Sequence, residues 1–133
     1  MNNKTIDVTA AVIIKDNKLL IAQRPHHDQL ASLWEFPGGK KENSETLEEC
    51  LHRELKEEFE IDASIGKHLI SSFFEYPHIK INLEAFLIEN YKGEIKLNSH
   101  DDVRWISLDE VSKYEFAEAD KPILNEIIKS GLL

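Results

Sequence analysis

The segment from Gly39 to Ile61, GKKENSETLEECLHRELKEEFEI, decides how this chain folds. Its second half predicts a helix from Thr46 to about Phe59, because Thr46 is a good N-cap and Glu49, three residues later, completes a capping box. With about 100° of rotation per residue, the apolar side chains form one stripe, which we expect to face the core. These side chains are Leu47, Cys50, Leu51 and Leu55.

Two glutamates of this helix belong to its solvated face. Glu48 and Glu49 lie opposite the apolar stripe. Each faces a side chain four residues later, His52 for Glu48 and Arg53 for Glu49, and such pairs support a helix modestly. We therefore expect both glutamates to be ordinary surface acids.

Three further glutamates do not fit a solvated face. Glu54, Glu57 and Glu58 cluster at i, i+3 and i+4 spacing, on a face that overlaps the apolar stripe near the helix C-terminus. The helix dipole disfavours negative charge there, and crowded like charges are unfavourable unless a cation compensates them. Oxygen ligands suit a hard cation, Mg²⁺ or Mn²⁺, better than zinc. Metal binding is therefore favoured over a merely solvated acidic face.

Upstream of the helix, a Pro-Gly-Gly turn offers backbone atoms to a ligand. Gly38 and Gly39 follow Pro37 in EFPGGK. Glycine backbones adopt unusual dihedral angles and pass close to bound groups. Together with the acidic helix, this turn predicts a strand–loop–helix site that holds a metal between a backbone carbonyl and carboxylates.

The rest of the chain has the character of strands, with one more helix. A last helix is expected from Asp120, as its N-cap, to Ser130, with Pro122 in the first turn. Strands with one central and one terminal helix predict an α/β fold, a mixed sheet flanked by helices. Asp16-Asn17 is a turn signal between the first two strand segments. The segments rich in β-branched and aromatic residues are 6–15, 17–24, 68–76, 79–91 and 103–108.

Length and charge narrow the function. The chain has 133 residues, which suits a single domain over 1–133, and its net charge is -9. Such an acidic surface repels polymeric nucleic acid and anionic membranes, although a divalent cation can bridge it to a small phosphorylated ligand. The single Cys50 and the lack of an apolar stretch of the ~20 residues that a membrane span needs predict a soluble, cytoplasmic protein.

The segment that decides the fold also resembles the Nudix box. One position departs from the family pattern, because Glu60 stands where the family has a glycine that ends the helix in the left-handed conformation. We expect this departure to cost local stability and to leave the metal ligands in place. The match begins at Gly39, with Glu45 after a spacer of five residues and Arg53-Glu54-Leu55 after a spacer of seven. After one more residue it continues with Glu57-Glu58, and it ends at the apolar Ile61.

The flanking sequence is similar to the MutT branch of this family. LLIAQRP and LWEFPGGK precede the helix, and YEFAEADKPIL lies near the C-terminus. The resemblance implies a Nudix α/β/α sandwich over the whole chain. It also implies a hydrolase that cleans the nucleotide pool, and so serves DNA repair, by cleaving nucleoside triphosphates to a monophosphate and pyrophosphate with Mg²⁺ or Mn²⁺.

The resemblance assigns the metal ligands. Glu54, Glu57 and Glu58 would bind the metal together with the backbone carbonyl of Gly38. A metal held there would shield the triphosphate and lower the pKa of the water that attacks phosphorus. Glu54 and Glu57 are therefore also expected to be catalytic.

The remaining catalytic roles are an orienting ion pair and a general base. Arg53 would orient the carboxylates through an ion pair with Glu45. The general base stays open, because some relatives use a box glutamate and others an acid from the loop before a late strand. In the loop NSHDDVRW, Asp101 and Asp102 are the candidates, and a plain turn formed by the two aspartates is equally compatible. MutT has a glutamate where this chain has Arg104.

Substrate contacts are expected from five residues. Arg24 matches a substrate-contacting arginine of the MutT branch. Asp120 falls where MutT has a purine-reading asparagine and where relatives that cleave CTP have aspartate, and it also suits a helix cap. Phe36 and Tyr76 would supply an apolar or stacking wall, and the backbone at Gly39 would approach the ligand. The polar loop 25–32 is expected to close over the nucleotide.

Two substrate classes fit, an oxidised purine such as 8-oxo-dGTP, and CTP or a 5-substituted dCTP. The alternatives are a Nudix hydrolase of sugar nucleotides or dinucleoside polyphosphates, and a non-catalytic Nudix domain that only binds nucleotides. Intact box acids argue against the latter. The histidines at 68, 78 and 100 form no evident constellation.

Overall fold

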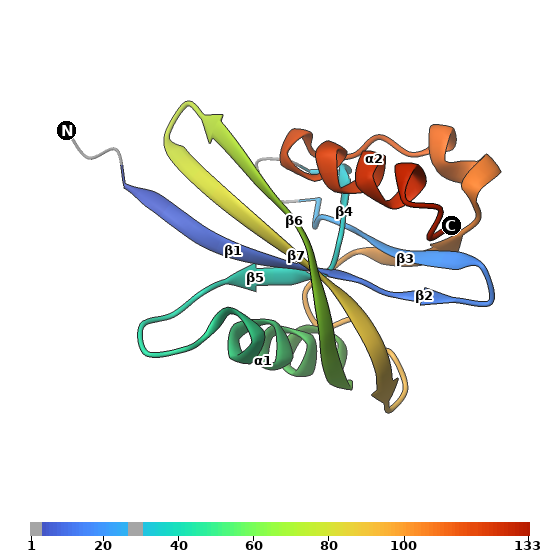
Figure 1. Ribbon diagram of the computed structural model, residues 1–133, viewed down its shortest axis with the longest axis horizontal. Coiled ribbons are helices and arrows are strands. Elements are labelled where there is room, and N and C mark those ends of the chain that lie inside the picture. The colour runs from blue at the N-terminus through green and yellow to red at the C-terminus, as the bar shows by residue number, and fades with distance from the viewer. Residues whose placement is uncertain (1–3, 27–30) are drawn as a thin grey trace.

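Two sheets lie between two helices on opposite sides of the molecule, as Figure 1 shows. The structure is a computed structural model that describes residues 4–26 and 31–133. The expected α/β/α sandwich is confirmed, since α1 covers one side of the sheets and α2 the other. The elements are β1 (Thr5–Val12), β2 (Ile14–Lys15), β3 (Lys18–Gln23), β4 (Trp34–Glu35), β5 (Gly38–Lys40), α1 (Leu47–Phe59), β6 (Asp62–Tyr76), β7 (Ile79–Lys92), β8 (Asp102–Ile106), the 3₁₀ turns η1 (Leu108–Lys113) and η2 (Glu118–Asp120), and α2 (Lys121–Lys129).

The strands form two four-stranded sheets, where the sequence predicted one mixed sheet. The first has the order β5-β1-β7-β6, and it is mixed because β1 and β7 run parallel while its other pairs are antiparallel. In the second, β3 pairs with β2 and β4, and also with β8. The chain passes from one sheet to the other at Ile13, between β1 and β2.

Alternation along the strands fills a core on each side of the sheets. In β1, Ala10 and Val12 pack in the core beneath α2, whereas Ala11 packs in the core beneath α1. Likewise Leu19 of β3 faces the α2 side and Leu20 the α1 side, and both are fully buried. Strands covered on both faces have no polar side to display, which explains their continuous apolar sequence.

The two tight turns expected between strands are present. Asp16 and Asn17 both have positive φ, 53° and 61°, as a type I′ hairpin between β2 and β3 requires. The second turn joins Tyr76 to Ile79, where β6 and β7 pair. In the part of the chain that the structure describes, no helix is long and apolar enough to cross a membrane.

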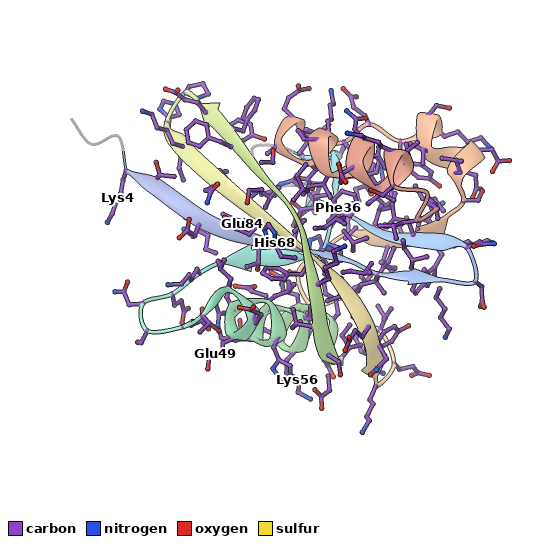
Figure 2. All side chains as sticks on the ribbon, in the orientation of Figure 1. Lys4, Phe36, Glu49, Lys56, His68 and Glu84 are labelled. Atoms are coloured by element: carbon purple, nitrogen blue, oxygen red, sulfur yellow. The ribbon has the colours of Figure 1, made fainter. Side chains whose placement is uncertain are left out.

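Helix α1 begins as the sequence predicts. The Thr46 side chain accepts a hydrogen bond from the Glu49 backbone N–H at 3.1 Å, and the Glu49 side chain accepts one from the Thr46 N–H at 2.8 Å. Figure 2 shows Glu49 and Lys56 on the outer side of α1, away from the sheets. The expected pairing of Glu49 with Arg53 is wrong because the cap uses Glu49, and His52 binds Asp62, at 2.9 Å, instead of Glu48.

Helix α2 also begins where expected, with Asp120 at its N-cap position, but the Asp120 side chain does not cap it. Asp120 precedes the helix and Pro122 lies in the first turn. The Asp120 side chain makes no capping hydrogen bond and instead accepts one, at 2.9 Å, from the backbone N–H of Phe36. This bond ties the start of α2 to the segment after β4.

The end of α1 shows what the missing box glycine costs. Glu60 caps the helix in the left-handed conformation, with φ 57° and ψ 36°, and its N–H reaches the carbonyls of Leu55 and Lys56. A residue with a Cβ atom pays about 1 kcal/mol or more for this conformation, and glycine does not. The helix therefore ends as in the family, with a strained residue in place of glycine.

We expect Glu60→Gly to raise the free energy of unfolding by about 1 kcal/mol, because it removes the left-handed strain. Equilibrium denaturation with urea measures this change. Glu60→Ala is the matched control, since it removes the same charge but keeps the Cβ atom. A glycine variant no more stable than the alanine variant would show that no strain is stored there.

Candidate active site

A cavity of about 860 Å³ lies where the sheets, the end of α1 and the start of α2 meet. Of the residues that the sequence predicted for the site, the following line it: Arg24, Phe36, Gly38, Gly39, Glu58, Tyr76 and Asp120. The other predicted residues lie outside this lining, namely Glu45, Arg53, Glu54, Glu57 and Asp102. The residues predicted to contact substrate are thus brought together at the cavity, whereas most of the predicted acids lie outside its lining.

Arg53 forms a network of ion pairs behind that wall. Its guanidinium donates to both oxygens of Glu45, at 2.6 and 3.0 Å, and to the backbone carbonyl of Lys40 at 3.1 Å. The third nitrogen lies 3.1 Å from Glu54 and 3.2 Å from Glu57. The Arg53 hydrogen bonds, helped by the Glu42 N–H, lower the pKa of Glu45 to about 2. The ion pair expected between Arg53 and Glu45 is therefore present.

The adjacent glycines allow the helix and β5 to approach each other. A Cβ atom on Gly39 would lie 2.2 Å from the Glu54 carboxylate carbon. A Cβ atom on Gly38, whose φ is 154°, would lie 1.9 Å from the carbonyl oxygen of Thr9. No larger residue fits at either position without displacing these groups. At Gly39 the close approach is made to Glu54 itself, and the expected approach of this backbone to a ligand stays a prediction.

Glu54 and Glu58 form a pair of carboxyl groups at the cavity. Burial raises the pKa of both, and the nearby charges of Glu54 and Glu35 help to bring the pKa of Glu58 to about 8. Each carboxyl group is close enough to the other to shift its pKa. Glu58 Oε1 is buried and, among the described residues, has no hydrogen-bond partner. Glu57 differs from this pair, because its side chain is 59% exposed.

These donors fit a hard divalent cation. Across residues 4–26 and 31–133, no three His, Cys, Asp or Glu side chains already stand together as a ligand set. The Glu54–Glu58 pair nevertheless offers oxygen donors only, one of them buried and unpartnered, in a place where like charges resist ionisation. A cation would supply the missing partner and relieve this repulsion.

A second cluster at the cavity was not predicted. Glu35 lies between Arg24, 2.6 Å from its Oε1, and His100, 2.9 Å from its Oε2. The His100 ring stacks on Phe59 with 5.1 Å between the ring centroids. Glu35 and His100 are 65 positions apart, so no local pattern reports this contact. The available signal in the sequence was that Glu35 directly precedes Phe36, a predicted site residue.

The opposite wall gathers the residues predicted to read the base. Asp120 is only 7% exposed, and burial raises the pKa of its carboxyl well above the ordinary value. The hydrogen bond from the Phe36 backbone N–H holds the Asp120 carboxyl next to Phe36. The hydroxyl of Tyr76 accepts a hydrogen bond, at 3.4 Å, from the Ala119 N–H in η2. Phe36, Tyr76 and Asp120 therefore meet at one wall, as expected.

The two loop aspartates do not reach the cavity. Asp102 accepts from its neighbour Val103 at 2.8 Å and pairs with Arg104 at 2.8 Å. Asp101 accepts the backbone N–H of His26 at 2.9 Å. Asp102 begins β8 and binds its own neighbours, whereas Asp101 binds the segment after β3, so the two do not form a plain turn and neither lines the cavity. The general-base role of Asp102 stays a prediction. The loop expected to close over the nucleotide falls largely on residues 27–30, outside the described part of the chain.

Known proteins with similar sequences and structures belong to the family that the sequence resembles. A family model described as NUDIX domain matches residues 9–126. A CTP pyrophosphohydrolase of Escherichia coli (strain K12) is 40% identical over 121 residues, which is 91% of this chain and 90% of that protein. An 8-oxo-dGTP diphosphatase of Proteus vulgaris is 41% identical over 96 residues, 71% of this chain and 86% of that protein. The solution structure of the E. coli ORF135 protein has a TM-score of 0.85 and 38% identity, covering 95% of this chain and 90% of that one.

The raised pKa of Glu58 predicts how stability depends on pH in metal-free buffer. In the unfolded chain the pKa of this group is near its ordinary value of 4.5, and in the folded chain it is about 8. Between these values the folded state retains a proton that the unfolded state releases, so stability falls as pH rises and levels off above about 8.

We expect Glu58→Gln to flatten this decline and to be more stable than the wild type at pH 8 by about 2 kcal/mol. Urea denaturation in EDTA at pH 5 and pH 8 measures it. Glu48→Gln on the exposed face is the control and should leave the decline unchanged. A wild-type protein equally stable at both pH values would contradict the buried carboxyl pair.

Proposed function

Because the chain belongs to the Nudix family, we propose that it is a Mg²⁺-dependent nucleoside-triphosphate pyrophosphohydrolase that releases a monophosphate and pyrophosphate. The family's need for a divalent metal agrees with the donors described above. The observation that carries the proposal is the Glu54–Glu58 pair at a cavity large enough for a nucleotide. The nucleotide pool lies in the cytoplasm, where we expect the protein to work.

The metal-binding residues would be Glu54, Glu58 and the carbonyl of Gly38, joined by Glu57 from the same helical turn. Mn²⁺ could replace Mg²⁺, because both are hard cations that prefer oxygen. A bound divalent cation would neutralise charge on the triphosphate and lower the pKa of an attacking water. The raised pKa of Glu58 means that this carboxyl holds a proton near neutral pH, which it would give up on binding a cation.

Around that centre, the basic and acidic side chains have separate tasks. Arg53 holds Glu45 and Glu54 in place, so that the carboxylates need not reorganise when substrate binds. Arg24 lines the cavity and offers a positive charge to the nucleotide. With Asp102 committed to Arg104, the proton acceptor is best sought among the box glutamates, Glu54 or Glu57. Arg53 and Glu45 therefore contribute to catalysis by positioning.

The base would bind between Phe36, Tyr76 and Asp120. One Asp120 oxygen accepts the Phe36 N–H, and the carboxyl lies in the lining of the cavity. A carboxyl group kept neutral by its raised pKa accepts, through its carbonyl oxygen, from an exocyclic amino group such as that of cytosine, and its proton can be donated to a ring nitrogen. This favours CTP or a 5-substituted dCTP, in keeping with the relative named a CTP pyrophosphohydrolase. The relative named an 8-oxo-dGTP diphosphatase keeps the oxidised purine as the second candidate.

The first test is Glu57→Gln, which removes a proposed ligand without changing the side-chain volume. We expect kcat to fall by at least about 100-fold, because loss of a metal ligand removes both binding and activation. Pyrophosphate release from CTP measures it. Glu48→Gln is the matched control on the other face of α1 and should retain full activity. Near-normal turnover of the Glu57 variant would refute the assignment.

The second test compares kcat/KM over a panel of CTP, 5-methyl-dCTP, 8-oxo-dGTP and dGTP. We expect the cytosine nucleotides to lead, and Asp120→Asn to reduce their advantage by about 10-fold or more, because an amide oxygen held by the Phe36 N–H leaves the NH₂ group, a donor, to face the amino group of the base. An unchanged order of preference in Asp120→Asn would show that Asp120 serves only the contact with Phe36.

A further inference from the structure

The loop that follows β7 docks on the C-terminal end of α1. The Lys96 N–H donates to the Phe59 carbonyl at 2.9 Å, and the Asn98 N–H donates to the Glu58 carbonyl at 3.1 Å. The Asn98 side-chain amide donates to the Glu57 carbonyl at 2.8 Å. The last carbonyls of a helix have no partners within the helix, so they need donors from elsewhere. This loop provides three of them.

Asn98 is the residue of this loop that contacts the predicted metal-binding glutamates directly. Its main chain and side chain bind the backbones of two consecutive glutamates, Glu58 and Glu57. Both contacts restrain the last turn of α1, and the Glu58 side chain of that turn enters the cavity wall. Asn98 itself lies outside the lining of the cavity. It can therefore affect a cation there only through the helix.

Two residues later, His100 links the last residue of α1 to Glu35, the ion-pair partner of Arg24. Its side chain is 5% exposed, and its Nε2–H donates to Glu35 Oε2 at 2.9 Å. The ring stacks on Phe59, with 21° between the ring planes. Nδ1 is buried and, within the described residues, has no hydrogen-bond partner. Glu35 and Phe59 therefore set the orientation of the ring, and His100 in turn fixes Glu35.

We propose that Asn98 and His100 are positioning residues that hold the two sides of the site in register. Asn98 sets the helical turn of Glu57 and Glu58, and His100 sets Glu35 on the nucleotide side. The inference rests on the proposed function, because it assigns these residues to the metal and nucleotide sides of that same site. It follows that the two residues have different effects, since each acts on a different ligand.

For Asn98, the readout is Mn²⁺ binding to the nucleotide-free protein, measured by calorimetry. We expect Asn98→Ala to weaken Mn²⁺ binding about 10-fold, as loss of an outer contact to metal ligands does. CMP binding should stay within about twofold of the wild type, because the nucleotide side is unaltered. Asn90→Ala is the matched control, since the side chain of this exposed asparagine in β7 accepts a hydrogen bond from the Ser64 hydroxyl of β6.

For His100, the readout is CMP affinity and the KM for CTP at saturating metal. We expect His100→Ala to raise the Kd for CMP and the KM for CTP about 5-fold or more, and to leave Mn²⁺ affinity within about twofold. His100→Gln, whose amide N–H can reach Glu35 as Nε2 does, should recover most of this loss. The control is His52→Ala, which removes an exposed histidine bound to Asp62.

Separate effects on Mn²⁺ and on CMP would support the inference. If both alanine variants keep wild-type affinity for both probes and lose only thermal stability, the loop is merely structural and the inference is overturned. If each of the two variants weakens the binding of Mn²⁺ and of CMP equally, the assignment of separate effects to Asn98 and His100 is likewise refuted. A wild-type protein that binds Mn²⁺ and hydrolyses CTP while the variants match it would refute only this inference. A wild type that does neither would refute the proposed function itself.

Discussion

The guanidinium of Arg53 joins three parts of the chain that would otherwise be independent. It binds Glu45 in the loop before α1, the Lys40 carbonyl of β5, and Glu54 one residue further along the helix. Glu45 and Glu54 are only 14% and 13% exposed, so their charges need a fixed partner. Removing one member of such a partly buried pair leaves the other uncompensated, which costs more than the pair contributes. The approach of Glu54 to Gly39 therefore depends on this one cation.

The approach of Glu54 to Gly39 explains why the site forms where the core beneath α1 meets the core beneath α2. The strands bury side chains on both faces, with α1 over one core and α2 over the other. The cavity takes Val8 and Tyr76 from the α2 side and Glu58 from α1. Glycine at 39 lets the acidic helix come close to β5, and glycine at 38 lets β5 lie against Thr9 of β1. Charge is thus concentrated beside apolar surface, which suits a ligand with a base at one end and phosphates at the other.

Local sequence signals predicted the elements well where the interactions are local. The capping box of Thr46 and Glu49, the Asp16-Asn17 turn and the buried stripe of α1 follow from spacing alone, and each is present. The ion pair of Arg53 with Glu45, and the burial of Glu54, were also expected. Spacing failed for the pairing of Glu49 with Arg53, because a cap and a stronger partner competed for the two side chains.

Contacts between distant segments were beyond such signals. The bond from Phe36 to Asp120 spans 84 positions, and the bond from His100 to Glu35 spans 65. Both depend on how β4, η2 and the loop after β7 pack together, which no periodicity encodes. The same holds for the division of the strands into two sheets, since continuous apolar runs indicate burial but not partners. Burial on both faces could be predicted, and the pairing could not.

The central claim is that the acidic end of α1 and the glycines of β5 together form a divalent-cation site at the cavity. Paramagnetic broadening of backbone amide signals by substoichiometric Mn²⁺ tests it most directly. The account predicts that the amides of Gly38, Gly39 and residues 54–58 broaden first, while those on the outer face of α2 stay sharp. Broadening centred elsewhere, for example on Asp109 and Glu110 in η1, or spread evenly over the acidic surface, would contradict it.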